Sequence, residues 1–142
     1  MRFALAAAMV AVLLVVFAGG CSPHAHADWA FSVAVTPDGS QIVSGSGDDT
    51  VKVWDLNTGA LLRTLTGHTD SVYSVAVTPD GTKIVSGSGD KTLKVWDLNT
   101  GALLRTLTGH AAEVNAVAVT PDGSEIVSGS SDKSSRIVAS EQ

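Results

Sequence analysis

The chain is poor in cysteine, in aromatic residues and in positive charge. A single cysteine among 142 residues excludes an intramolecular disulfide framework. Aromatic residues make up 5% of the chain while glycine occurs 14 times, which disfavours a helical bundle and favours a turn-rich β protein. Lysine and arginine number 9 against 14 acidic residues, giving a formal net charge of −5. A nucleic-acid binder needs a basic surface, so we predict no nucleic-acid partner.

The longest apolar stretch lies at the amino terminus. After Met1-Arg2, residues 3–18 are all apolar, and Gly19-Gly20-Cys21 follows. A positive start, a short hydrophobic run and small residues are typical of a secretory signal peptide. We therefore predict a signal helix over residues 1–20, a short tether over residues 21–27 and a folded region over residues 28–142.

The stretch before Cys21 leaves three interpretations of how the signal is processed. It is similar to a bacterial lipobox, in which the cysteine is lipidated, although Ala18 stands where that pattern usually has Leu, Val or Ile. Alternatively, Ala25-His26-Ala27 is an A-x-A cleavage site that would release a soluble secreted or periplasmic protein. Thirdly, the run could stay uncut as an anchor, near the lower length for spanning a bilayer. We expect an exported lipoprotein anchored at the cell envelope, and Ser22 favours outer-membrane or surface sorting.

A repeat of 42 residues organises the rest of the chain. Residues 30–68 and 72–110 are identical at 33 of 39 positions, and a third copy begins at His110. Apolar residues alternate with a period of two inside each copy, which predicts strands. Four short antiparallel strands per copy are typical of a β-propeller blade. In the second copy we expect strands at residues 74–77, 83–86, 92–96 and 103–107, with turns at 78–81 and 97–101 and a glycine-rich segment at 87–90.

The repeat also carries a sequence signature. Gly67-His68 and Gly109-His110 recur at the repeat spacing, as do Val53-Trp54-Asp55 and Val95-Trp96-Asp97. These motifs resemble the WD-repeat family, whose units of about 40–45 residues carry Gly-His and Trp-Asp. The resemblance covers roughly residues 26–133. It implies an all-β fold, a partial propeller with four-stranded antiparallel blades at about residues 26–66, 68–108 and 110–142.

The resemblance implies a hydrogen-bonded tetrad of His, Ser, Asp and Trp in each blade. An indole N–H needs an acceptor, a hydroxyl can accept and donate, and an imidazole can bridge a hydroxyl and a carboxylate. Val138 stands where the third tryptophan is expected, so we predict an incomplete third network. The tetrad residues are His26, Ser44, Asp48 and Trp54; His68, Ser86, Asp90 and Trp96; and His110, Ser128 and Asp132.

Catalytic and metal-binding interpretations of these residues are weaker. Ser, His and Asp repeat with the blade, whereas an active site needs one copy and an oxyanion hole. Residues 45–51 superficially fit a calcium-binding repeat, but that motif recurs in tandem nonapeptides and not once per blade. His24 and His26 alone make no closed metal site. We predict no enzymatic activity, no cofactor and no metal.

The third copy departs from the pattern. Residues 134–140 replace the expected third strand, and no fourth strand follows in the sequence. Propellers typically have about 4–8 blades, so a monomer would be an open arc with exposed edges and blade faces. Two chains could join into one ring of roughly six blades. The chain could also complete another propeller, or it could be a truncated remnant.

The three copies differ in the loops before the first strand and between the second and third, where we expect a protein-binding face. Trp29, Phe31 and Tyr73 are the expected anchors, although these side chains could instead pack between blades. The predicted function is a non-enzymatic protein-interaction scaffold at the bacterial envelope. A non-functional fragment and a propeller-type hydrolase completed by oligomerisation are the competing hypotheses. The candidate binding residues are Trp29, Phe31, Asp49, Tyr73, Lys91, Asn115 and Lys133.

Overall fold

The structure, a computed structural model, describes residues 25–140. All regular elements in that range are β-strands, as the repeat pattern predicts. The expected signal helix, His24 and Cys21 lie outside the described residues. Within the described range, no helix has the length and apolar character needed to cross a bilayer.

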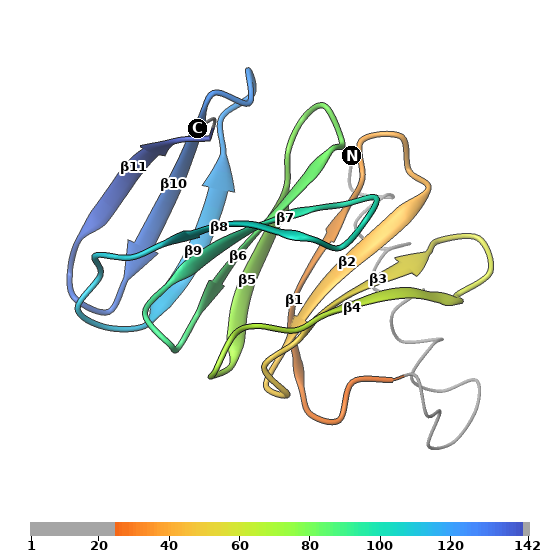
Figure 1. The fold of residues 1–142 in the computed structure, drawn as a ribbon, viewed down its shortest axis with the longest axis horizontal. Helices are drawn as coiled ribbons and strands as arrows, with labels where there is room; N and C mark the ends of the chain where they lie inside the picture. Colours follow the sequence, from red (N-terminus) through yellow and green to blue (C-terminus); the bar gives the residue numbers. More distant parts are fainter. Residues whose placement is uncertain (1–24, 141–142) are drawn as a thin grey trace.

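The strands form three antiparallel sheets that follow the three copies of the repeat. In each sheet the strands lie in sequence order, so each sheet is a simple meander. Figure 1 shows the sheets fanned side by side, from the orange first sheet to the blue third sheet. The predicted all-β partial propeller is therefore confirmed, with a third blade of three described strands. The strands are β1 (Ala30–Val35), β2 (Gln41–Ser46), β3 (Val51–Asp55) and β4 (Leu61–Leu65); β5 (Val72–Val77), β6 (Lys83–Ser88), β7 (Leu93–Asp97) and β8 (Leu103–Leu107); and β9 (Val114–Val119), β10 (Glu125–Ser130) and β11 (Ser135–Ala139).

The Thr-Pro-Asp-Gly turns connect the first two strands of each sheet. In the first turn, Thr36 Oγ1 donates to Asp38 Oδ1 at 2.6 Å, and Gly39 N–H donates to the Thr36 carbonyl at 2.8 Å. Gly39 has a φ of 72°, a backbone conformation that favours glycine. Hydrogen bonds from Thr36 and Ser40 lower the pKa of Asp38 to about 2. The carboxylate is thus a hydrogen-bond acceptor at neutral pH, and the turn is stabilised by hydrogen bonds between its own residues.

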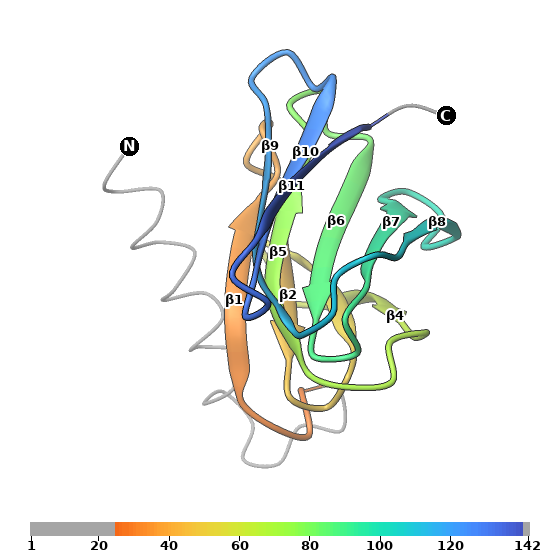
Figure 2. The same ribbon diagram turned by 90° about the vertical axis from the view of Figure 1, so that its left-hand side faces the viewer.

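Apolar side chains between neighbouring sheets form the core. The first strands β1, β5 and β9 are spatial neighbours, while β4 and β8 lie on the far side of the molecule (Figure 2). Two clusters of buried residues fill the junctions between sheets. The first junction buries Val43, Val51, Val53 and Leu65 against Val72, Val75, Ile84, Trp96 and Leu98. The second buries Val85, Leu93 and Val95 against Val114 and Ile126.

The second strand of the second sheet is two residues longer than the expected strand at 83–86. Gly87 and Ser88 belong to β6, and Gly87 is needed there because the third sheet packs closely against it. A Cβ on Gly87 would lie 2.8 Å from Val114 Cγ1 and 2.9 Å from Val117 Cγ1. The glycine therefore provides room for two valines of the next sheet. Gly45 has the equivalent place in β2, where a Cβ would lie 2.7 Å from Val72 Cγ1.

The expectation that residues 134–140 replace the third strand of the last copy is also wrong. They include β11, which pairs with β10 in antiparallel register, with Ser128 opposite Arg136 and Ile126 opposite Val138. Adjacent Ile137 and Val138 are β-branched and suit an extended backbone, and backbone pairing does not need the missing tryptophan. The loss of the Trp-Asp motif therefore changes the side-chain packing of this strand without removing the strand.

Candidate functional site

The first two sheets each contain a closed polar network. In the first, His26 Nδ1 lies 2.9 Å from Asp48 Oδ2, and His26 Nε2 lies 2.7 Å from Ser44 Oγ. Trp54 Nε1 donates to the same serine oxygen at 2.9 Å. The structure thus brings together all four residues named for this sheet. The network connects the segment before β1 to β2, to β3 and to the loop between them.

The second sheet repeats this geometry closely. His68 lies 2.7 Å from both Asp90 Oδ2 and Ser86 Oγ, and Trp96 Nε1 donates to Ser86 Oγ at 2.9 Å. The bonds define one direction of donation when the imidazole is neutral. The indole N–H donates to the hydroxyl, the hydroxyl to Nε2 of the imidazole, and Nδ1–H to the carboxylate. Every polar atom in this chain of bonds has a partner.

Burial and hydrogen bonding fix the charges in these networks. Burial lowers the pKa of His26 and His68, although the neighbouring aspartate opposes that shift in each case. Burial alone would raise the pKa of Asp48, but hydrogen bonds from Thr50, from the Ala27 N–H and from His26 lower it to about 2. The equivalent Asp90 also has a pKa lowered to about 2. Near neutral pH, each network therefore holds a neutral imidazole and a carboxylate.

The third sheet has a network without an indole. His110 lies 2.8 Å from Asp132 Oδ2 and 2.9 Å from Ser128 Oγ. Val138 cannot donate to the serine, and Arg136 Nη2 instead donates to the carbonyl of Gly109 at 2.7 Å. A Cβ on Gly109 would lie 3.0 Å from Arg136 Nη1, whereas one on Gly67 would lie 3.2 Å from Trp96 Cη2. The guanidinium therefore covers the glycine that the indole covers in the second sheet.

The buried position of the network serines bears on the hydrolase interpretation. Ser44 and Ser86 have no exposed surface, and Ser128 is 3% exposed. A nucleophilic hydroxyl must reach the carbon that it attacks, and these hydroxyls are enclosed by their own sheets. The arrangement can hold loops and strands together, but it offers no reacting atom to a substrate.

The described residues bring together no metal-binding set. Within residues 25–140, no group of three or more His, Cys, Asp or Glu side chains could hold an ion. His26 directs both ring nitrogens to protein atoms, and Asp48 accepts hydrogen bonds on both carboxylate oxygens. Neither side chain is therefore available in this structure for the metal interpretations of the sequence.

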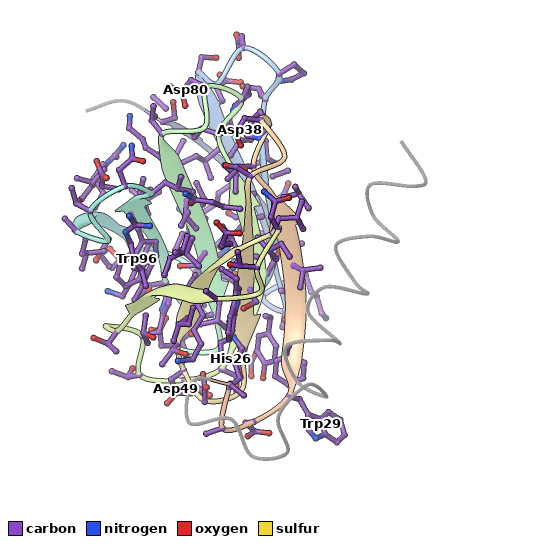
Figure 3. The ribbon with its side chains drawn as sticks, turned by 90° about the vertical axis from the view of Figure 1, so that its right-hand side faces the viewer. His26, Trp29, Asp38, Asp49, Asp80 and Trp96 are labelled. Carbon is purple, nitrogen blue, oxygen red and sulfur yellow. The ribbon has the colours of Figure 1, made fainter. Side chains whose placement is uncertain are left out.

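The aromatic residues of the candidate binding face fall into two groups. Trp29 is 77% exposed and projects away from the sheets at the end of the molecule that also holds His26 and Asp49 (Figure 3). Phe31 on β1 and Tyr73 on β5 lie against each other across the first junction, with ring centroids 5.3 Å apart. Phe31 is still 45% exposed, so the pair both packs between sheets and forms surface.

One turn position carries a different charge in successive sheets. Asp49, Lys91 and Lys133 occupy equivalent places with φ of 67°, 72° and 68°. Burial and the nearby carboxylates of Asp70, Asp48 and Asp90 raise the pKa of Asp49. Lys91 and Lys133 are exposed. The same left-handed backbone therefore presents an acidic side chain on the first sheet and basic ones on the next two.

Asn115 lies apart from the aromatic group. It is exposed on β9 and donates through Nδ2 to Ser131 Oγ at 2.7 Å within the third sheet. The structure therefore does not place all the candidate binding residues in one cluster. Phe31 and Tyr73 meet at the first junction, Trp29 precedes β1 and Asp49 lies in the turn after β2, whereas Asn115 and Lys133 belong to the third sheet.

Two kinds of repeated contact were not predicted from the sequence. Lys52 Nζ donates to Thr64 Oγ1, and Lys94 Nζ donates to Thr106 Oγ1, each at 3.0 Å between the third and fourth strands. Ser32 Oγ accepts a hydrogen bond from Val75 N–H on the next sheet. The recurrence of these residues at the repeat spacing was a signal for all of them, but a repeat alone does not show which copies touch.

Three meander sheets packed face to face, with their first strands adjacent, define a segment of a β-propeller. The family model for the WD domain, G-beta repeat, matches residues 19–55, 59–97 and 101–138. The chain belongs to the WD-repeat family. Each matched unit in residues 59–138 begins near the fourth strand of one sheet and ends on the third strand of the next.

The chain is also similar to curated proteins over about the length of one repeat. The chain is 58% identical over 40 residues to the ribosome biogenesis protein BOP1 homolog of Drosophila grimshawi, and 56% identical over 40 residues to that of Drosophila melanogaster. Each match covers 28% of this chain and 5% of the relative. The chain thus spans about one twentieth of the length of these relatives, and the similarity extends over a single WD-repeat unit.

Proposed function

We propose that this WD-repeat protein is a non-enzymatic scaffold that binds another protein through an aromatic loop surface, defined as Trp29, Phe31, Tyr73 and Asp49. The observation that carries this proposal is the 77% exposure of Trp29, and the partly exposed Phe31–Tyr73 pair adds to it. Large aromatic side chains dominate the binding energy of protein interfaces, and their exposure is costly without a partner.

The charges around this surface indicate the chemistry of the partner. Asp49 lies close enough to Asp70, Asp48 and Asp90 for their negative charges to raise its pKa. A partner segment that contacts both these carboxylates and the exposed aromatic residues would carry basic and apolar side chains. Arginine would suit both parts, because its guanidinium binds carboxylates and stacks on aromatic rings.

A photo-cross-linking amino acid placed at position 29 would test this proposal in the native host. We expect it to trap one protein in stoichiometric amounts, and Trp29→Ala to abolish co-purification of that protein. Leu104→Ala is the matched control, because Leu104 is 46% exposed on the distant β8. Unchanged co-purification with Trp29→Ala would overturn the proposal.

We also propose that the protein is exported and lipidated at Cys21. Two observations support this site over the A-x-A site at residues 25–27: the lipobox-like sequence and the position of His26. Cleavage after Ala27 would remove His26, whose ring bonds Asp48 and Ser44 in the first network. Cleavage before Cys21 would leave that network complete.

Processing can be tested by mass spectrometry of the mature amino terminus after growth with an alkyne-tagged fatty acid. We expect a lipid-modified Cys21, and no label in Cys21→Ser. A mature chain beginning at Asp28 would instead establish a soluble secreted protein and contradict the lipid anchor. An intact Met1 in the membrane fraction would establish an uncut anchor.

A hydrolase activity and a role in ribosome biogenesis have no comparable support. A hydrolase requires a reachable nucleophile, and the network serines are enclosed. The ribosome biogenesis role of the curated relatives concerns proteins of which this chain matches 5%. The short match shows that the repeat pattern is shared, and it shows no further property of those relatives in this chain.

A further inference from the structure

The segment before β1 is bound to the first sheet from His26 onward. The ring of His26 lies 2.9 Å from Asp48 Oδ2 and 2.7 Å from Ser44 Oγ. The next residue, Ala27, donates its N–H to the same Asp48 oxygen at 2.9 Å. The chain therefore cannot leave the sheet at this point without breaking three hydrogen bonds.

This segment also carries Trp29 and lies at one end of the sheets. Gly47 N–H donates to the Trp29 carbonyl at 2.9 Å, which joins Trp29 to the turn that contains Asp49. Figure 3 shows His26, Trp29 and Asp49 at one end of the molecule and Asp38 at the opposite end. β1 runs between the two ends with six residues, so they lie about 20 Å apart at roughly 3.3 Å per residue.

The number of residues between Cys21 and His26 limits how far this end can lie from a lipid on Cys21. An extended chain spans at most about 3.6 Å per residue, so the five steps from Cys21 to His26 reach at most about 18 Å. With the lipid in a bilayer, as proposed above, the end that carries Trp29 stays within that distance of the headgroups. A folded domain of about 100 residues, with a radius of gyration of about 13 Å, is wider than this gap.

The charge of this end distinguishes a protein partner from the lipid surface itself. The carboxylates of Asp70, Asp48 and Asp90 lie close enough to Asp49 to raise its pKa. Anionic headgroups repel such a group of carboxylates, whereas they attract basic segments next to a membrane-spanning helix. A basic segment at the bilayer surface is therefore attracted both by the lipid and by these carboxylates.

We infer that the partner of the aromatic loop surface is a juxtamembrane segment of an integral membrane protein, with basic and apolar side chains. This inference rests on the proposed function and names the class of its partner. Trp29 contacts the apolar side chains of the segment, and the carboxylates around Asp49 bind its basic side chains. A segment of this kind fits in the gap that excludes a folded domain.

The reach of the tether is tested with the lipidated protein in vesicles that contain a headgroup-labelled lipid. A fluorescent amino acid is placed at position 29 or, as the matched control, at position 57. Asn57 is exposed at the opposite end, in the turn that the Leu56 N–H joins to the Ser40 carbonyl at 2.9 Å. We expect more efficient energy transfer to the lipid from position 29. Equal transfer from both positions would overturn the inference.

A longer tether provides a control for this measurement. About 40 glycine and serine residues inserted after Ser22 span about 35 Å on average, which exceeds the distance between the two ends. The difference in energy transfer between positions 29 and 57 should then disappear. A difference that persists with the long tether would show that the tether does not determine it, and would overturn the inference.

The class of the partner is tested by the position of the cross-link from residue 29 in the intact host membrane. Mass spectrometry identifies the attached peptide. We expect a basic segment within about twelve residues of a membrane-spanning helix, since twelve residues span about 18 Å even as a helix. A peptide from a soluble protein would overturn the inference. An adduct with lipid would assign the surface to the bilayer and would also overturn it.

A charge reversal tests the role of the carboxylates. Asp49→Lys should lower the yield of the cross-linked product by about tenfold, because an attractive charge becomes repulsive. The fold accepts lysine there, since Lys91 and Lys133 occupy the equivalent places with the same backbone conformation. Glu125→Lys makes the same change of charge at an exposed position of β10 and should leave the yield unchanged. Equal yields from the two variants would contradict a basic partner.

These outcomes separate the inference from the proposed function. A cross-link to a soluble protein that Trp29→Ala no longer binds would leave the protein-binding function in place and contradict the juxtamembrane partner alone. No cross-link to any protein would overturn both. A mature chain that begins at Asp28 would remove the tether and overturn the inference without bearing on protein binding.

Discussion

The hydroxyl of Ser32 accepts a hydrogen bond at 3.1 Å from the backbone N–H of Val75, and so joins the first sheet to the second. Ser74 repeats this bond with Val117, also at 3.1 Å, between the second sheet and the third. The donors Val75 and Val117 lie on β5 and β9, the first strands of the second and third sheets, and each of these sheets packs on the preceding sheet. The apolar junctions between sheets thus each contain a directed polar contact, which limits how far the sheets can slide past each other.

Replacing Ser74 with alanine should destabilise the second junction. The N–H of Val117 would lose its acceptor in a partly buried position, which costs about 1–3 kcal/mol. Urea denaturation followed by tryptophan fluorescence measures the effect. The matched control is Ala116→Ser, an exposed position on β9, which should leave the midpoint unchanged. Equal midpoints for Ser74→Ala and the wild type would contradict the assigned role.

Trp96→Phe should destabilise the second sheet by roughly 1–3 kcal/mol, from the lost donor and the smaller ring. The indole is 1% exposed and its N–H donates to the buried Ser86. Thermal unfolding followed by far-ultraviolet circular dichroism provides the measurement. Trp29→Phe changes a residue that is 77% exposed and should have no effect on the melting temperature. Similar losses in both variants would show that the network contributes little.

Gly87→Ala and Gly129→Ala form a matched pair at equivalent positions of neighbouring sheets. An added Cβ at position 87 would lie 2.8 Å from Val114 Cγ1, whereas at position 129 the nearest atom is Ala116 Cβ at 3.9 Å. We expect Gly87→Ala to cost about 1–3 kcal/mol through overpacking. Gly129→Ala should be tolerated. Chemical denaturation of both variants side by side would refute the packing argument if their stabilities were equal.

Stability should fall in two steps as the pH is lowered. Burial lowers the pKa of His26 and His68 below the ordinary 6.5, so the unfolded chain takes up protons first and stability declines as the pH falls below about 6.5. Asp48 and Asp90 have pKa values of about 2 against an ordinary 3.8, so a second loss occurs between about pH 4 and pH 2.

The melting temperature measured from pH 8 to pH 2 would reveal both steps. Asp90→Asn should reduce the second step, because the second network then has no carboxylate to protonate. A melting temperature that stays constant from pH 8 to pH 5 would rule out the buried neutral histidines as a source of pH dependence.

The strand content could be predicted because it is encoded locally and repeated, as in the alternation around Val95. The members of each polar network, such as His68, Ser86 and Trp96, were implied by the resemblance to the WD-repeat family. The Thr-Pro-Asp-Gly turn closed by Asp38 was visible in the sequence, since turn chemistry depends on adjacent residues.

Contacts between sheets could not be predicted in the same way. Gly87 was placed in the glycine-rich segment after the strand, yet its role depends on Val114 and Val117 of another sheet. The Phe31–Tyr73 pair joins two strands of different repeats, and alternation within one strand does not show which neighbour a side chain meets. β11 forms because backbone pairing with β10 tolerates a changed side-chain sequence.

The two described junctions are built from the same parts: a glycine on one sheet, two valines on the next and a serine that accepts a backbone N–H. The same junction can therefore be repeated after a copy of the first or second sheet, whereas the third sheet has Ala116 in place of the serine. Duplication or loss of one 42-residue unit in the coding sequence would lengthen or shorten the arc by one blade and leave every remaining junction unchanged. In this protein, blade number is consequently free to change in evolution by recombination between its own repeats, with no intermediate that has a mismatched junction.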